Sequence, residues 1–281
     1  MDRYIIVFCE GDHDIEFLKR ILQVDGFKSY DKKAKDFIAP FDELYINALT
    51  KNIKIKDRKF KFQGHNEEVP YSAMTQHNTL IIFHNMGGDG NIEKSSQKIV
   101  QKYLQLNDEI IREAKGYDKL DFRFLYFLDA DNQGVVQRLK DIENLVEIDT
   151  LTHYTIAQID DYEIGCGVFY NTQSVNHHGK LEDILLELMI PSNETIFHES
   201  SSFIEKNQLD DSRQRKYICT DTKEKPDGNI EFKKEKSIIS VAGQLQFSGS
   251  TNAVIIAKSD YIKKEDILNS THCQNIIKLF E

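Results

Sequence analysis

Short apolar runs, each followed by polar residues, divide the first two thirds of the chain. Residues 4–9 (YIIVFC), 79–84 (TLIIFH) and 122–128 (FRFLYFL) consist almost entirely of aliphatic and aromatic side chains. A continuous apolar run of this length is typical of a strand buried on both faces, as in parallel sheets. A fourth strand is expected at 153–159 (HYTIAQI), and GCGVFY at 165–170 suggests another.

Helical periodicity fills the segments between these runs. Apolar residues at helical spacing mark residues 15–22, 92–115, 133–144 and 177–190. Alternation of strands and helices favours an α/β fold in which right-handed crossovers cover both faces of a parallel sheet. The pattern therefore predicts an α/β protein with a parallel sheet of about four strands and helices on both faces.

Two segments of the sequence depart from this alternation of strands and helices. Residues 28–77 contain one helical pattern and a basic stretch, and we interpret them as an insertion in a core that spans 1–190. Residues 191–281 are expected to form a C-terminal α/β extension that completes the core.

Within that extension, residues 210–236 are polar and charged, which predicts a mobile loop or an exposed hairpin. A helix is expected at 236–242 and a strand at 253–257, followed by a short C-terminal helix.

Bulk properties narrow the class of protein. The 281 residues carry a net charge of −10, which argues against a large DNA-coating surface because such a surface needs a clustered positive field. No apolar run reaches the roughly 18 residues of a membrane helix, and the four cysteines are widely spaced. These features predict a cytoplasmic protein with no membrane contact and no disulfide framework.

The most basic stretch of this acidic chain is KNIKIKDRKFKF at 51–62, which alternates basic and apolar residues like a two-stranded ribbon. One basic face of such a hairpin could hold a phosphate backbone. A solvated edge hairpin guarded by lysines is the alternative. The candidate nucleic-acid contacts are Lys54, Lys56, Arg58, Lys59 and Lys61.

Two groups of acidic residues follow predicted strands. Asp129 and Asp131 come at the end of the central run, and residues two apart on an extended chain point the same way. Neighbouring carboxylates repel unless a cation sits between them, and Mg²⁺ is the natural resident. The alternative is an acidic turn that starts the next helix. Glu10 ends the first strand, Gly11 permits a tight turn, and Asp14 lies in the first helical turn, where simple capping is the alternative.

Two motifs give these acids a family resemblance. FCEGDHDIEFL, with Glu10, Gly11 and Asp14, resembles the VEG-x-x-D opening of Toprim domains, and FLDADNQG, with Asp129, Asp131 and Gly134, resembles their D-x-D-x-x-G motif. The GGDGN loop at 87–91 and GKLEDILL at 179–186 are similar to small stand-alone Toprim proteins related to the overcoming-lysogenization-defect nucleases. The long basic insertion departs from the family pattern.

The resemblance implies a metal-dependent nuclease that uses one or two Mg²⁺ or Mn²⁺ ions. Asp129 and Asp131 would ligate one ion, and Glu10 would ligate it too or act as general acid or base. Asp14 would help a second ion. In such nucleases a later acid and a downstream lysine complete the site. Glu182 is the best match for that acid with Asp160 in reserve, and Lys236 is the best match for the lysine.

Two functional hypotheses follow. The first is a phosphodiesterase that cuts DNA or RNA, which the resemblance extends to a phage-defence effector working with an ATPase partner. The second is a partner-binding or regulatory Toprim module whose own nuclease activity is latent or absent. The sequence leaves the substrate, the number of ions and a homodimer open.

Overall fold

The computed structural model describes residues 1–281 except 2, 50–66, 211–214, 220–223 and 230–231. The chain divides into two compact units, one formed by Met1–Ile184 with Lys264–Glu281 and the other by Leu185–Lys263. The first division thus falls near the expected boundary at 190, but the C-terminal segment belongs to the first unit. The basic ribbon expected at 51–62 lies outside the described residues.

The first unit is built on a mixed sheet in the order β2-β3-β4-β1-β5-β7-β6. β4, β1, β5 and β7 pair in parallel, whereas β3 and β6 flank them in antiparallel pairing. The expected insertion supplies β2 and β3 at one edge. The strands are β1 (Arg3–Cys9), β2 (Lys28–Ser29), β3 (Ser72–Gln76), β4 (Thr79–Asn85), β5 (Asp121–Asp129), β6 (Ile156–Ile159) and β7 (Tyr162–Phe169).

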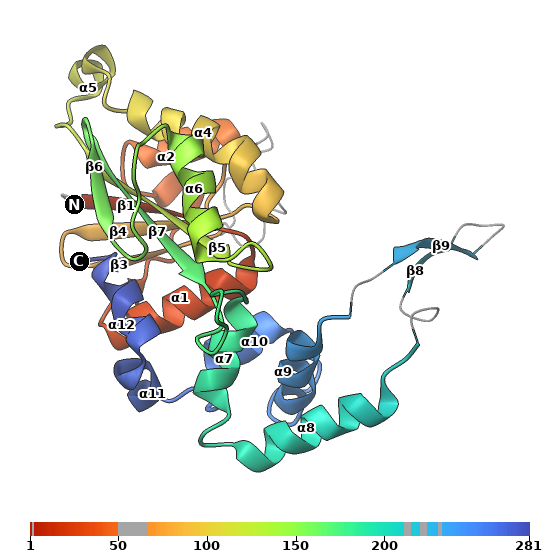
Figure 1. Cartoon of the computed structure of the whole chain (residues 1–281). Coiled ribbons are helices and arrows are strands. Elements are labelled where there is room, and N and C mark those ends of the chain that lie inside the picture. The colour runs from red at the N-terminus through yellow and green to blue at the C-terminus, as the bar shows by residue number, and fades with distance from the viewer. Residues whose placement is uncertain (2, 50–66, 211–214, 220–223, 230–231) are drawn as a thin grey trace. The chain divides into compact units, whose positions relative to one another are not determined.

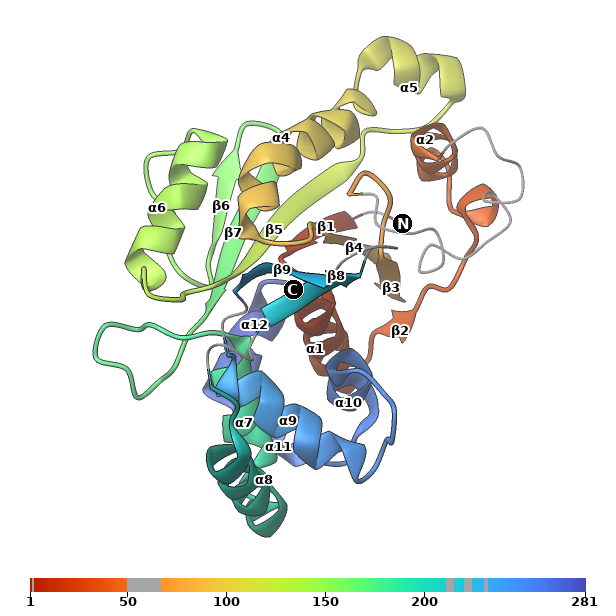
Figure 2. The same ribbon diagram turned by 90° about the vertical axis from the view of Figure 1, so that its right-hand side faces the viewer.

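Helices cover both faces of this sheet, which confirms the α/β class expected from the sequence. Figures 1 and 2 show α4 and α6 on one face and α1 and α12 on the other. The helical elements of the unit are α1 (Asp12–Val24), η1 (Ala34–Asp36), α2 (Phe41–Ala48), α4 (Asp89–Gln105), α5 (Glu109–Lys115), α6 (Val135–Val146), α11 (Lys264–Asn269) and α12 (Thr271–Lys278). The single helix expected at 92–115 is interrupted because Asp108 caps a new helix, α5.

Burial on both faces explains the continuous apolar runs. Consecutive residues of β1 point to opposite faces, and all of them from Tyr4 to Cys9 are buried. On one face Phe8 packs against Tyr126 with ring centroids 5.0 Å apart, and on the other Phe127 stacks on Phe280 at 6.1 Å. Each fully buried side chain of this size contributes about 1.5–3 kcal/mol to the stability of the fold.

One strand direction differs from the expectation. The run at 153–159 was predicted to join the parallel sheet, but β6 returns antiparallel to β7 through a tight turn at Asp160 and Asp161. The fourth parallel strand is β7, which contains most of GCGVFY. A run's composition does not fix its direction, and a two-residue connection permits only antiparallel pairing.

The second unit contains α8 (Glu194–Asn207), α9 (Lys234–Gln244), α10 (Asn252–Lys258) and the antiparallel strands β8 (Arg215–Cys219) and β9 (Glu224–Asn229), while α7 (Leu181–Met189) spans the division. The hairpin matches one of the two alternatives predicted for 210–236, and the helix predicted at 236–242 lies within α9. The strand predicted at 253–257 is wrong, because these residues form α10. A short apolar run carries no period that separates a buried helix from a strand. Gly243 lets α10 approach α9, since a Cβ there would lie 2.1 Å from the Cδ1 atom of Ile255.

No helix in the described part of the chain combines the length and the hydrophobicity that crossing a membrane requires.

A buried arginine links two strands of the sheet to the end of the C-terminal helix. The Arg123 side chain is 6% exposed, and its Nε donates to Glu163 Oε2 at 2.6 Å. One terminal nitrogen of Arg123 also donates to the carbonyl oxygen of Leu279 at 2.6 Å. Arg3 and Asp121 form a comparable pair at 3.2 Å, but their side chains are 32% and 49% exposed.

We expect Glu163→Gln to lower the free energy of unfolding by about 1–2 kcal/mol, because it leaves the buried Arg123 charge without its counter-ion. The matched control is Asp121→Asn, which removes the exposed pair and should cost less than about 0.5 kcal/mol. Urea denaturation of both variants measures the difference. Equal losses would contradict a structural role for the buried pair.

Candidate functional site

The carboxyl ends of the four parallel strands meet at one edge of the sheet. Cys9, the last residue of β1, pairs with Asn85 of β4 and Phe127 of β5. Glu10 follows directly, and its Oε1 accepts a hydrogen bond from the backbone N–H of Asp129 at 2.9 Å. The structure therefore brings Glu10 and Asp129 together across 119 positions of sequence, as the sequence predicted.

Asp14 reaches the same edge from the first turn of α1. Its side chain is buried, and Oδ2 accepts from the backbone N–H of Gly11 at 2.9 Å. This is the capping role considered from the sequence. Asp14 also raises the pKa of Asp129 by charge repulsion. Its carboxylate therefore caps the start of α1 and at the same time acts on Asp129.

The start of α7 supplies the last acid. Asp129 Oδ1 accepts from the backbone N–H of Leu181 at 2.7 Å, which fixes the helix start beside β5. Glu182 is the next residue and is only 2% exposed. Its Oε1 lies 3.5 Å from Nδ1 of His13. We call Glu10, Asp14, Asp129 and Glu182 the carboxylate cluster.

The electrostatics of the cluster are visible at Asp129. Burial raises the pKa of Asp129 well above its usual range, and the negative charges of Asp14, Glu10 and Glu182 raise it further. The Leu181 N–H acts in the opposite direction by stabilising the carboxylate. Asp129 is thus an acid whose ionised form is disfavoured as long as no positive charge joins the cluster.

Asp131 lies differently from the sequence expectation. β5 ends at Asp129, and Asp131 adopts a φ of 46°, so the two side chains do not continue an extended strand. The backbone of Asp131 instead exchanges hydrogen bonds with Gly179 at 2.6 and 3.0 Å. Its side chain is 48% exposed and pairs with Arg138.

Arg138, from α6, is a residue that sequence reasoning missed. Its side chain is 4% exposed. Nε donates to the carbonyl oxygen of Asp129 at 2.8 Å, and a terminal nitrogen donates to Asp131 Oδ2 at 2.8 Å. The signal was present in the spacing, because Arg138 lies one helical turn after Gly134 and so faces back along the helix toward the Asp pair.

Two glycine positions permit this backbone arrangement. Gly134 has a φ of 81°, and a Cβ there would lie 2.8 Å from the carbonyl oxygen of Asn176. Gly88, within the GGDGN loop, donates its N–H to the carbonyl oxygen of Glu10 at 2.8 Å. The glycine loop therefore lies against the backbone of Glu10, on the side of β4.

The remaining candidates lie elsewhere. Asp160 was the reserve metal ligand, but it occupies the β6–β7 turn, which precedes β7. It therefore lies at the amino ends of the parallel strands, whereas Asp129 lies at their carboxyl ends. The reason is the antiparallel direction of β6. Lys236 is in the first turn of α9, in the second unit, and its catalytic role stays a prediction. Lys54, Lys56, Arg58, Lys59 and Lys61 lie outside the described residues.

The donor set suits a hard cation, although the side chains are not arranged around one. Across the described residues, no group of three or more His, Cys, Asp or Glu side chains is placed to hold a metal ion. Carboxylate oxygens are nevertheless the ligands that Mg²⁺ and Mn²⁺ prefer, and the raised pKa of Asp129 shows that positive charge would stabilise the cluster.

Comparison with protein-family models finds no match, and comparison with curated proteins finds none either. Among solved structures, the chain resembles a hypothetical protein from Pyrococcus horikoshii OT3, with a TM-score of 0.49 and 13% sequence identity. The alignment covers 100% of this chain and 94% of that protein. A likeness of this degree carries no argument about the function of the chain.

Asp129→Asn should raise the melting temperature of the metal-free protein at pH 7. The raised pKa means that the folded state binds more protons than the unfolded state, so stability falls as pH rises from about 4 through the folded pKa. Asn removes this loss, with about 2–4 °C expected for each kcal/mol recovered. The gain should be small near pH 4, because the folded state keeps Asp129 protonated there and the unfolded state is already about half protonated.

Calorimetric melting in EDTA at both pH values measures the effect, with Asp149→Asn as an exposed aspartate control. A decrease in melting temperature of similar size at pH 4 and pH 7 would show that Asp129 serves packing rather than charge.

Proposed function

We propose that the chain is a metal-dependent phosphodiesterase of the Toprim type that cuts nucleic acid. The observation that carries this proposal is the convergence of Glu10, Asp14, Asp129 and Glu182 at the carboxyl edge of a parallel sheet. The sequence order also supports it, because Glu10 follows the first parallel strand and Asp129 ends the third.

The chemistry of the cluster favours a divalent cation, with Mg²⁺ or Mn²⁺ as the resident. Glu10, Asp129 and Glu182 would hold it, with Asp14 contributing negative charge nearby. When bound, such a cation polarises a phosphoryl oxygen and lowers the pKa of a water nucleophile.

Residues around the cluster prepare this site. The Leu181 N–H holds one oxygen of Asp129, and Glu10 holds the Asp129 backbone, so the ends of β1, β5 and α7 are fixed relative to each other. These hydrogen bonds limit how far the carboxylates would have to move to surround a cation. His13 Nδ1 lies 3.5 Å from Glu182 Oε1, and this histidine would add a general acid or base to the candidates from the sequence.

Asp131 would join the site by leaving Arg138. Its carboxylate is half exposed and pairs with the guanidinium of Arg138, which also holds the Asp129 carbonyl. Moving the carboxylate toward a cation would leave Arg138 anchored by that carbonyl. We therefore assign Asp131 to the metal-loaded form of the site, and Arg138 to the positioning of the turn.

DNA and RNA fit the same carboxylate chemistry, and the basic ribbon proposed to contact the phosphate backbone lies outside the described residues. An ATPase partner and a role in phage defence follow from the sequence resemblance and stay part of the proposal. The alternative, a partner-binding Toprim module with latent activity, predicts the same fold without turnover.

The test combines cleavage with metal binding. Plasmid DNA, single-stranded DNA and tRNA are incubated with the protein in Mg²⁺ or Mn²⁺, and Mn²⁺ affinity is measured by titration calorimetry. We expect Asp129→Asn and Glu10→Gln each to reduce the cleavage rate by about 100-fold or more, since each removes a ligand that supplies several kcal/mol of transition-state stabilisation.

Asp149→Asn, which changes an exposed aspartate away from the cluster, should cleave like the wild type. Mn²⁺ binding that depends on Asp129 but produces no cleavage of any substrate would favour the partner-binding alternative. A metal-dependent function is refuted if the protein shows no Mn²⁺ binding and cleaves no substrate.

A further inference from the structure

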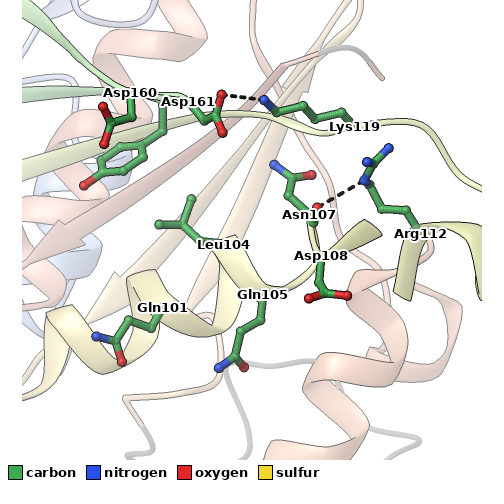
Figure 3. Close-up of a pocket in the computed structure, with 10 residues that line it drawn as sticks. Gln101, Leu104, Gln105, Asn107, Asp108, Arg112, Lys119, Asp160 and Asp161 are labelled. Atoms are coloured by element: carbon green, nitrogen blue, oxygen red, sulfur yellow. Dashed lines mark hydrogen bonds and ion pairs between the residues drawn. The ribbon is translucent and has the colours of Figure 1, made fainter. Parts of the chain in front are cut away.

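A cavity lies at the opposite end of the parallel strands from the carboxylate cluster. It has a volume of about 660 Å³, which falls in the range of small-molecule sites. Its walls come from α4, the α4–α5 connection, α5, the segment before β5 and the β6–β7 turn. Figure 3 shows Leu104 projecting from α4 into the space between the acidic turn and Asn107.

One side of the cavity carries a positioned guanidinium. Arg112 Nε donates to the carbonyl oxygen of Asn107 at 3.1 Å (Figure 3). The Asn107 side chain is itself fixed, because it exchanges hydrogen bonds of 2.9 and 2.8 Å with the backbone of Leu120. An anchored Nε leaves the terminal nitrogens of the guanidinium as a fork suited to a phosphate or carboxylate.

A lysine beside it can change partner at little cost. Lys119 Nζ lies 2.6 Å from Asp161 Oδ1, and the two side chains are 50% and 74% exposed. Exposed pairs of this kind contribute about 0–1 kcal/mol, so an anionic ligand could replace Asp161 as the partner of Lys119.

The other side of the cavity is acidic and partly apolar. Asp160 adopts a φ of 42° in the β6–β7 turn, and Gln158 fixes this turn by donating to the carbonyl oxygens of Asp160 and Tyr162 at 3.1 and 3.0 Å. Tyr162 and Leu104, both half-buried, provide the apolar surface between the acidic and the basic side. A simple anion would meet Asp160 as well as Arg112, so the cavity suits a ligand with an anionic end and a hydrogen-bond donor at the other.

We propose that this cavity binds a nucleoside monophosphate whose base carries an exocyclic amino group. The phosphate would pair with Arg112 and Lys119, the base would lie over Leu104 and beside Tyr162, and the amino group would donate to Asp160. The proposal is independent of the nuclease function, since the cavity shares no residue with the carboxylate cluster.

Titration calorimetry of the 281-residue chain tests this assignment with AMP, CMP, UMP, inorganic phosphate and free amino acids as separate ligands. We expect AMP and CMP to bind about tenfold more tightly than UMP, which lacks the amino group, because a hydrogen bond to a charged group is of that size. Asp160→Asn should abolish this preference. Arg112→Gln should weaken all three nucleotides by about tenfold or more.

Circular dichroism and melting of each variant exclude unfolding as the cause, and Asp149→Asn serves as the charge-matched control. The proposal is overturned if no nucleotide binds at millimolar concentration, if UMP binds as well as AMP and CMP, or if the Asp160 and Arg112 variants behave like the wild type. Binding of amino acids or phosphate alone, without nucleotides, would overturn it in favour of those ligands.

Discussion

The hydrogen bond from the Asp129 amide to the Glu10 carboxylate joins the two strands on which the candidate site depends. Its 2.9 Å length fixes the side chain of a residue that follows β1 against the backbone at the end of β5. The parallel register of these strands makes the contact possible, because Cys9 lies opposite Phe127 and both chains leave the sheet at the same edge. The first turns of α1 and α7 lie at the same edge. Asp14 of α1 accepts from the Gly11 N–H there, and the Leu181 N–H of α7 donates to Asp129.

Gathering buried carboxylates at one place costs electrostatic free energy, and hydrogen bonds from the backbone offset only part of that cost. Backbone N–H groups at two helix starts hold Asp14 and Asp129, where the helix dipole favours negative charge. Those dipoles do not offset the combined effect of burial and neighbouring acids, since the pKa of Asp129 stays well above its usual range. A protein that gathers acids in this way loses stability at neutral pH, which is typical of sites shaped by binding rather than by folding.

The sequence predicted this part of the structure well for a physical reason. Runs buried on both faces must be continuously apolar, so β1, β4 and β5 were visible without knowledge of their neighbours. The carboxyl ends of such strands share an edge, so Glu10 and Asp129 could be placed together from the order of the elements alone. Glu182 needed the family resemblance, because nothing in its local sequence indicates that α7 begins beside β5.

The sequence failed where tertiary contacts decide between local alternatives. The apolar run that forms α10 is too short to show a period of its own, and in the fold it packs as a helix against Gly243 of α9. Asp131 was expected to follow the strand, but the buried guanidinium of Arg138 and the backbone of Gly179 hold it in another conformation. Neither partner is close to Asp131 in an extended chain, so a rule based on strand alternation could not include them.

The direction of strand β6 also decides at which end of the sheet the acidic side chains of the β6–β7 turn lie. Had β6 run parallel to β7, a crossover would have placed Asp160 at the same edge as Asp129, adding one more acid to a cluster that already disfavours ionisation. The antiparallel return instead moves the acidic turn to the other edge, where Lys119 neutralises Asp161 and Arg112 lies across the cavity. One sheet thereby carries a cluster of carboxylates at one end of its parallel strands and side chains of mixed charge at the other.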